Sequence, residues 1–360
     1  MTPVPPLAPP IKLLIVDDSA LMRRKLREIF QQAGGFEVRT ARNGADALER
    51  IPEFAPDVIS LDIHMPAMDG LTCLSHIMVE HPTPVVMVSS LTEEGALATL
   101  EALELGAVDY LPKPGGTVSV HMETVADQLV AKVRAAARAR VERWSGSRGG
   151  APQRTTAKRA APPPADAPAV ERLLLIGVST GGPKTLEKIL PRLPADFPLP
   201  ILVAQHMPAS FTRVFAQRMD QRCVLPVTEV TGPTVLEAGH VYLAKGDADM
   251  VVRTRPRGIS ALPVPADPET VWHPSVDRLV ESACDVLPPR RLLGVLLTGM
   301  GDDGAEAMSR IHTDGGRTIA EAEESAIVFG MPRELILRRG AEAVLPADRI
   351  ADRLCQWVGC

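Results

Sequence analysis

Short apolar runs rich in Val, Ile and Leu alternate with amphipathic helical patterns along most of this 360-residue chain. Such alternation is typical of βαβ units built around a parallel sheet. It is interrupted in the segment 144–170, where Ala, Pro, Gly, Ser and Arg replace the periodic apolar residues. Because that composition cannot bury a core, we interpret the segment as a linker. The chain is therefore expected to form two α/β domains, over 11–143 and 171–360, preceded by a Pro-rich extension at 1–10.

The first domain is expected to contain five strands and five helices. The first helix is the clearest, because four apolar residues fall on one of its faces: Met22, Leu26, Ile29 and Phe30. The strands are expected at 12–17, 36–41, 57–62, 84–90 and 108–113.

The second domain is expected to be a doubly wound, mainly parallel α/β domain with an antiparallel excursion at 249–264. Its parallel strands are expected at 172–179, 200–207, 240–246, 291–300 and 317–322. Its helices are expected to begin near Pro183, Ser210, Ser275, Ala305 and Ala347.

Composition excludes several classes of protein. Hydrophobic residues make up 45% of the chain and charged residues 23%, which are ordinary globular values. No stretch approaches the roughly 20 apolar residues of a membrane span, and residues 1–10 lack a signal-peptide pattern, so we expect a cytoplasmic protein without direct membrane insertion. The five cysteines are dispersed and contain no CxxC pair, which argues against a disulfide framework or a zinc site.

Five polar side chains follow the carboxyl ends of strands expected in the first domain: Asp17, Asp18, Asp62, Ser89 and Lys113. In a doubly wound sheet such strand ends meet at the topological switch point. Three close carboxylates repel one another unless a hard cation compensates them, and Mg²⁺ suits such a site. Asp62 is central enough to accept a phosphoryl group. The alternative, in which these aspartates only cap helices, explains one of them but not the set.

The motifs VDDSA, LDIHMPAMDG, MVSS and LPKP resemble the receiver domain of two-component response regulators. The resemblance implies a flavodoxin-like fold and phosphorylation of Asp62 by a histidine kinase. It implies that Mg²⁺ is bound directly by two carboxylates and one backbone carbonyl, and by a third carboxylate through water: Asp18, Asp62, His64 and Asp17, respectively. It also implies three switch residues: Ser89, Tyr110 and Lys113.

The commonest output of a receiver is a DNA-binding domain, and this is the alternative from another functional class. Residues 171–360 carry 21 basic and 24 acidic side chains and show no basic recognition helix, whereas phosphate contacts require a basic face. We therefore expect no nucleic acid partner. Salt-sensitive duplex binding by residues 171–360 would favour the alternative.

The run LLLIGVSTGGPKTLEKIL joins an apolar strand, a Gly-rich turn and an amphipathic helix. Its GVSTG matches the G-x-S-x-G nucleophile elbow, which exposes a serine, here Ser179, beside helix N-terminal amides. Because such amides also bind phosphate, a nucleotide site is the alternative. The turn has neither the P-loop nor the G-x-G-x-x-G spacing, so hydrolysis is favoured.

A serine nucleophile needs a general base, and His206 ends the strand expected at 200–207, on the same sheet edge as Ser179. His240 instead precedes its strand and is expected at the opposite edge. The loop TGMGDDG supplies an orienting carboxylate from Asp302 or Asp303. A metal-binding loop is the alternative, but no other ligand cluster accompanies it. The chain order Ser–His–Asp differs from that of α/β-hydrolases, so a different fold is expected.

These segments, together with AIVFGMPRE at 326–334, resemble the catalytic domain of the chemotaxis protein-glutamate methylesterase (CheB) family. Matched by motif, the resemblance places the nucleophile at Ser179, the base at His206 and the orienting acid at Asp303. Thr180 and Met300 match residues that line the family's active site, and the amides around Ser179 and Met300 are candidates for an oxyanion hole.

The resemblance implies hydrolysis of glutamate methyl esters on methyl-accepting chemoreceptors, and often deamidation of their glutamines, during adaptation in chemotaxis. Ester hydrolysis is expected to need no cofactor, so Mg²⁺ belongs only to the receiver. Phosphorylation of Asp62 is expected to shift the population from a covered to an open catalytic edge.

Overall fold

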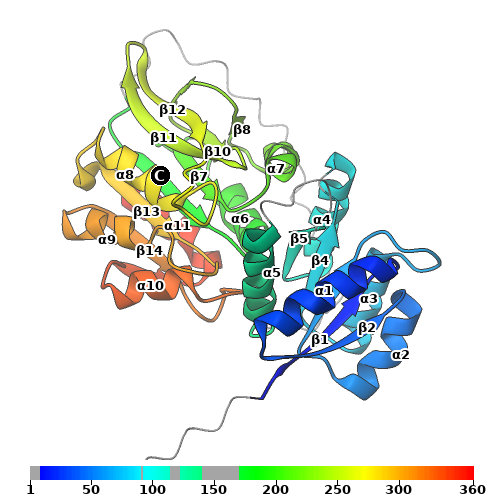
Figure 1. Cartoon of the computed structure of the whole chain (residues 1–360). Coiled ribbons are helices and arrows are strands. Elements are labelled where there is room, and N and C mark those ends of the chain that lie inside the picture. The colour runs from blue at the N-terminus through cyan, green and yellow to red at the C-terminus, as the bar shows by residue number, and fades with distance from the viewer. Residues whose placement is uncertain (1–8, 91, 114–121, 140–169) are drawn as a thin grey trace, which may run out of the picture. The chain divides into compact units, whose positions relative to one another are not determined.

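The computed structural model describes residues 9–90, 92–113, 122–139 and 170–360 (Figure 1). The chain divides into two compact units, Met1–Ser147 and Arg148–Cys360. The Pro-rich extension apart from residues 9 and 10, and the linker expected at 144–170 apart from Val170, lie outside the described residues.

The first unit is a five-stranded parallel sheet in the order β2-β1-β3-β4-β5, with the switch point between β1 and β3. This is the flavodoxin-like order. All five expected strands and five helices are present: β1 (Ile11–Val16), α1 (Ala20–Ala33), β2 (Phe36–Ala41), α2 (Gly44–Phe54), β3 (Val58–Asp62), α3 (Gly70–Glu80), β4 (Val85–Ser89), α4 (Glu93–Leu105), β5 (Asp109–Pro112) and α5 (Met122–Ala136).

Helices α1 and α5 pack together on one side of this sheet, while α2, α3 and α4 follow one another along the other side (Figure 1). Helix α1 buries Leu26 and Phe30 against the sheet. Its N-cap is Ser19, whose side chain accepts the Met22 amide. Asp17 and Asp18 therefore do not cap this helix, which removes the structural alternative for both residues.

The second unit contains a seven-stranded parallel sheet in the order β15-β14-β13-β6-β7-β10-β8. The chain starts at β6 and winds first to one side and then to the other, so its switch point lies between β6 and β13. A second, three-stranded antiparallel sheet, β11-β12-β9, packs against it at β8 and β10. The strands are β6 (Leu173–Val178), β7 (Ile201–Gln205), β8 (Val227–Val230), β9 (Thr234–Val235), β10 (Val241–Ala244), β11 (Ala248–Arg255), β12 (Gly258–Pro265), β13 (Leu292–Leu296), β14 (Arg317–Glu321) and β15 (Ala343–Leu345).

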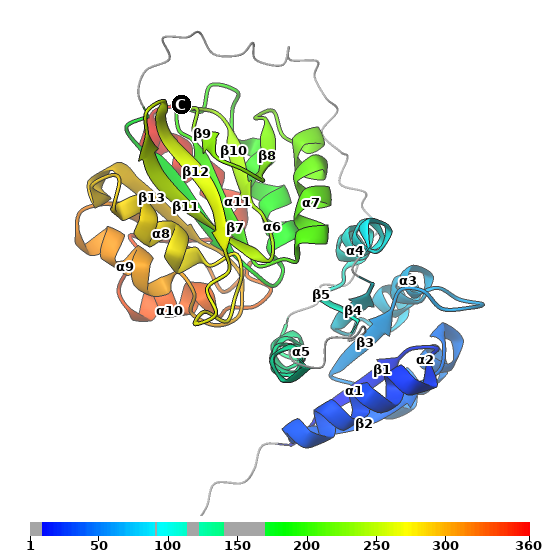
Figure 2. The same cartoon turned by 45° about the horizontal axis from the view of Figure 1, so that its top comes forward.

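Figure 2 shows α6, α7 and α11 behind the parallel sheet and α8, α9 and α10 in front of it, and the contacts among these helices agree. The helices are α6 (Gly182–Ile189), α7 (Ala209–Arg222), α8 (Val276–Cys284), α9 (Ala305–Thr313), α10 (Met331–Leu337) and α11 (Ala347–Val358), with 3₁₀ turns η1 (Leu190–Arg192) and η2 (Pro289–Arg291). Helix α8 lies so close to β6 that a Cβ on Gly177 would be 2.4 Å from Val276 Cγ1. No helix in the described ranges is long and apolar enough to cross a membrane.

The expected elements of the second unit are present, and the excursion at 249–264 is the β11–β12 hairpin. Sequence reasoning missed β8, β9, β15 and α10. Strands β8 and β15 are outermost in the parallel sheet and have only four and three residues, and β9 has two. Runs this short do not show a clear strand periodicity. Helix α10 has seven residues, too few for a clear helical periodicity.

Candidate functional site

Ser179 and His206 leave the carboxyl ends of the adjacent strands β6 and β7. Val178 pairs with Gln205 in the sheet, so the next residue on each strand lies at the same level. The His206 amide donates to the Val178 carbonyl (3.1 Å), and the Ser179 amide donates to the Thr298 carbonyl beyond β13 (2.9 Å). Both residues are nearly buried, with 4% and 6% of their surface exposed. The switch point thus brings three strand ends together.

The turn after Ser179 depends on two glycines. Gly181 has a φ of +79°, and Gly182 lies so close to Gln205 that a Cβ there would be 2.0 Å from Gln205 Oε1. The same Gln205 side chain donates from Nε2 to the Ser179 carbonyl (2.9 Å). Only a glycine pair therefore permits this tight passage from β6 into α6.

The His206 ring is held on two sides. Its Nε2 lies 2.8 Å from Asp303 Oδ2, and the ring stacks on Trp272 with the centroids 5.6 Å apart and an angle of 8° between the planes. Its Nδ1 is buried and makes no hydrogen bond within the described residues. One ring nitrogen is therefore engaged by a carboxylate and the other is available.

Asp303 is bound to the start of α8 as well as to His206. Its Oδ2 accepts the Val276 amide (2.7 Å), and its Oδ1 accepts the Asp277 amide (3.0 Å) and the Ser275 hydroxyl (3.1 Å). Burial alone would raise the pKa of Asp303, but the hydrogen bonds from His206 and the helix amides hold it below its ordinary value. The carboxylate therefore remains ionised beside the imidazole.

Met300 and Thr180 border this site, and the amides around Ser179 and Met300 stay candidates for an oxyanion hole. The Ser179 amide itself already donates to the Thr298 carbonyl. The Met300 amide donates to no acceptor among the described residues. Thr180 is buried, and its carbonyl accepts the Thr298 hydroxyl (2.9 Å). Of the two amides named, only that of Met300 is available to a substrate.

Sequence reasoning missed Glu321, a fully buried acid at the carboxyl end of β14. Its Oε2 accepts the Thr298 amide (2.7 Å), and its Oε1 accepts the Ser325 hydroxyl (2.8 Å). It thereby fixes the loop that follows β13 and contacts Ser179. Glu321 lies at a strand end, as Asp17 and Asp62 do. The surrounding residues RTIAEA, however, match no recognisable motif.

We expect Glu321→Gln to become more stable, relative to wild type, as the pH rises from about 5 to about 8. Burial raises the pKa of Glu321, although the Thr298 amide and Ser325 hydroxyl oppose the shift. A raised pKa means that the folded protein binds the proton more tightly than the unfolded chain, so this contribution to stability is greatest at low pH and is lost as the pH rises. Thermal unfolding of the variant beside the exposed control Glu323→Gln measures this. A difference in Tm that does not change with pH would contradict the prediction.

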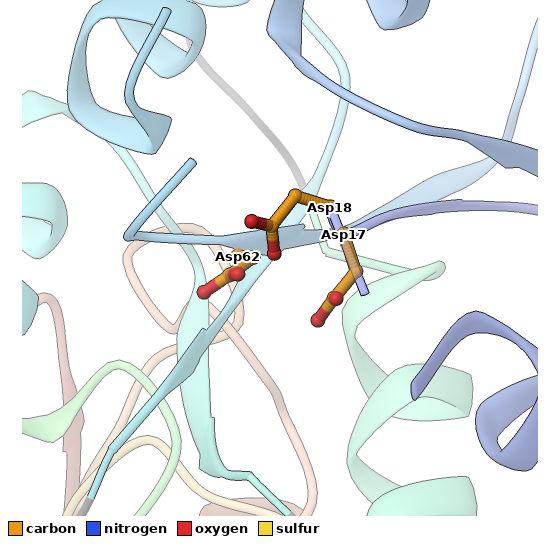
Figure 3. A group of neighbouring side chains, drawn as sticks. All are labelled: Asp17, Asp18 and Asp62. Carbon is orange, nitrogen blue, oxygen red and sulfur yellow. The ribbon is translucent and has the colours of Figure 1, made fainter. Parts of the chain in front are cut away.

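The first unit gathers three carboxylates at its own switch point. Asp17 and Asp18 follow β1 and Asp62 ends β3, and oxygens of all three lie within 4.8 Å of one another (Figure 3). Asp17 Oδ2 is buried without a hydrogen-bond donor among the described residues. Burial raises the pKa of Asp17, although Lys113 opposes the shift. These oxygens suit a hard divalent cation, which would compensate their charge.

The positively charged side chain of Lys113 lies beside these carboxylates. Its Nζ lies 2.6 Å from Asp62 Oδ2 and 3.7 Å from Asp17 Oδ2. Burial would lower the pKa of Lys113, but the two carboxylates raise it above its ordinary value. The other oxygen of Asp62 accepts the His64 amide (3.2 Å), so the backbone of His64 faces the cluster.

The remaining two residues expected in the receiver are buried near the same edge. The Ser89 hydroxyl donates to the Gly95 carbonyl (3.1 Å), and the Ser89 carbonyl accepts the Lys113 amide (2.8 Å). Tyr110 is 3% exposed, with the Lys132 ammonium 5.1 Å from its ring centroid.

His240 lies where the sequence places it, away from Ser179. It precedes β10, and its Nε2 contacts the Thr228 hydroxyl (2.9 Å). His273 binds the buried Asp249 through Nδ1 (2.9 Å), and His312 is in α9. Of the four histidines in this unit, His206 is the one bound to Asp303 beside Ser179.

A receiver-type unit with an acidic pocket thus precedes an α/β unit that carries a serine, a histidine and an aspartate at its switch point. Two family models match these units: "Response regulator receiver domain" over residues 13–123 and "CheB methylesterase" over residues 174–354. The chain belongs to the CheB methylesterase family, as its motifs predicted.

Relatives of similar length support this assignment. Protein-glutamate methylesterase/protein-glutamine glutaminase 3 of Rhodospirillum rubrum is 56% identical over 355 residues, which cover 96% of each chain. Protein-glutamate methylesterase/protein-glutamine glutaminase 2 of Rhodopseudomonas palustris is 52% identical and covers 96% of this chain and 98% of its own. The crystal structure of the Thermotoga maritima CheB methylesterase catalytic domain is 36% identical with a TM-score of 0.50, over 52% of this chain and 99% of that one.

Proposed function

We propose that this protein is a phosphorylation-regulated serine hydrolase that removes methyl esters from glutamate side chains of chemoreceptors and deamidates their glutamines. The observation that carries the proposal is the 2.8 Å bond between His206 Nε2 and Asp303 Oδ2 at the strand level of Ser179. The names of the two relatives supply the reaction class, which is hydrolysis of glutamate methyl esters and glutamine amides in proteins. The domains proposed are a receiver at 11–143 and a catalytic domain at 171–360.

The hydrogen bonding of His206 decides which ring nitrogen acts. In a neutral imidazole one nitrogen donates and the other accepts. Asp303 engages Nε2 and so keeps the proton there, which leaves the buried Nδ1 as the acceptor for the Ser179 hydroxyl proton. Serine proteases use the opposite nitrogens, so here the same roles are filled with the ring reversed.

The reaction follows from these positions. Ser179 Oγ forms a bond to the ester carbonyl carbon as its proton passes to His206 Nδ1. The Met300 amide donates to the oxyanion, and Asp303 stabilises the imidazolium. The carbon–oxygen bond to methanol then breaks, with the proton returned from His206. Water releases the glutamate by the same steps in reverse order, and with a glutamine the leaving group is ammonia.

The receiver unit regulates the hydrolase unit through phosphorylation. Asp17, Asp18, Asp62 and the His64 carbonyl would hold Mg²⁺, which when bound offsets the charge of an incoming phosphoryl group. Asp62 would accept that group from a histidine kinase, and Lys113 would move from the Asp62 carboxylate to the phosphoryl oxygens. This rests on the buried Asp17 oxygen, which has no hydrogen-bond donor among the described residues, and on the 2.6 Å ion pair between Lys113 and Asp62.

Methanol release from methylated receptor membranes, with and without a small phosphodonor, tests both units together. We expect wild type to release methanol and to accelerate when the phosphodonor is added. Asp62→Asn should keep the basal rate and lose the acceleration, because an amide cannot accept the phosphoryl group. Asp57→Asn, a surface change in the same unit, is the control. No methanol from wild type would refute the esterase, and undiminished acceleration in Asp62→Asn would refute the phosphoacceptor.

A further inference from the structure

Helix α9 begins directly after Asp303 and cannot cap itself. Its N-cap is Gly304, which has a φ of +85° and makes no side-chain capping bond. The first-turn amides of a helix need acceptors from elsewhere when the N-cap has none. Asp277 of α8 provides one, since its Oδ1 accepts a hydrogen bond from the Ala307 amide (3.2 Å).

The N-terminus of helix α8 is capped in turn by Asp303, which precedes α9. The N-cap of α8, Ser275, accepts the Arg278 amide, and Asp303 accepts the amides of Val276 and Asp277. Each helix therefore has an N-terminus bound by an aspartate that belongs to the other segment. The two carboxylates are close, and burial together with the charge of Asp303 raises the pKa of Asp277 to about 6.

We propose that Asp277 is a positioning residue that holds Asp303 in place for His206; this rests on the proposed function of Ser179, His206 and Asp303. The Ala307 amide belongs to the first turn of α9, which begins at Ala305, two residues after Asp303. Anchoring that turn on Asp277 therefore restrains the backbone from which the Asp303 side chain projects. The reciprocal bond from Asp303 to the Asp277 amide closes the pair.

A pair of partly buried carboxylates is a costly way to cap two helices, because like charges repel and burial disfavours both. A purely structural cap could be neutral. The arrangement is understandable if one member must stay ionised beside an imidazole, while the other fixes its position with the strength of a charge-assisted hydrogen bond.

Asp277→Ala and Asp277→Asn test the proposal, with Glu281→Gln as the matched control. Glu281 lies one turn further along α8 and also bridges to α9, through Arg310 (2.5 Å), but it caps no helix and is exposed. The rate of Ser179 modification by a fluorophosphonate probe is measured together with methanol release, each resolved into a maximal rate and a half-saturation concentration.

We expect Asp277→Ala to lower both maximal rates about 10- to 100-fold, because a misplaced catalytic group costs about that much, with half-saturation concentrations nearly unchanged. Asp277→Asn keeps an oxygen acceptor without its charge, so its rates should fall between those of wild type and Asp277→Ala. Glu281→Gln should react like wild type. Rescue by Asn and a loss confined to the maximal rates would separate positioning from a general loosening of α8 against α9.

Several results would overturn the proposal: wild-type rates in Asp277→Ala, equal losses in Asp277→Ala and Glu281→Gln, or an unreactive Ser179 in wild type. If Asp277→Ala does not fold, wild-type rates in Asp277→Asn would overturn it. A wild type that reacts with the probe but releases no methanol would instead remove the proposed substrate, and the probe rates would still decide the role of Asp277.

Discussion

Ser179→Ala should lower the rate of methanol release from methylated receptors by about a million-fold, to the background of the assay. The substitution removes only Oγ, the atom proposed to attack the ester, and keeps the Cβ. The backbone bond from Ser179 to Thr298 and the bond from Gln205 to the Ser179 carbonyl do not involve that atom. The fold should therefore be unaffected while the covalent step is lost.

The matched control for this change is Ser260→Ala. Ser260 is another buried serine of the same unit, in β12, and its hydroxyl donates to the Gly258 carbonyl (3.3 Å). It should leave methanol release unchanged, and both variants should unfold within a few degrees of wild type. Ser179→Ala should also lose labelling by the fluorophosphonate probe. Substantial hydrolysis by the Ser179→Ala protein would exclude an acyl-enzyme on this serine.

The sequence was sufficient to predict that each set of site residues lies at the carboxyl edge of its sheet, because residues at strand ends can be located from short apolar runs alone. Asp17, Asp62 and Lys113 follow three such runs, and the structure brings their side chains into contact. Ser179, His206 and Asp303 likewise follow β6, β7 and β13. Parallel strands place such residues on one edge whatever the details of packing, so their convergence is a consequence of topology.

The supporting residues could not be predicted in the same way. Asp277 sits inside a helix and Glu321 at the end of a strand without a motif, and each acts through backbone amides distant in sequence. Trp272 stacks on His206 from a loop of no regular structure. The sequence also could not show that the Ser179 amide donates a hydrogen bond to the Thr298 carbonyl, because this bond depends on how the loop after β13 packs beside Ser179. Such contacts depend on how loops and helices pack, which apolar periodicity does not specify.

Asp303→Asn should lower the maximal rate of methanol release about ten-thousand-fold. The Asp303 carboxylate accepts on both oxygens: Oδ2 from His206 and Val276, and Oδ1 from Asp277 and Ser275. An asparagine has one carbonyl oxygen, so in either orientation its amino group faces donors. If the oxygen remains with the Asp277 amide, the amino group points at His206 Nε2.

That orientation would reverse the tautomer of the imidazole. Nε2 would accept from the asparagine, the proton would move to Nδ1, and the nitrogen proposed to take the Ser179 proton would no longer accept it. Asp302→Asn is the control, because Asp302 is the adjacent acid, is 68% exposed and pairs with Arg338 at 3.2 Å instead of with His206. It should keep the wild-type rate within about twofold, as expected for an exposed ion pair. Equal losses in the two variants, or a near-normal rate in Asp303→Asn, would show that the carboxylate does not orient His206 and that the reversed-ring assignment is wrong.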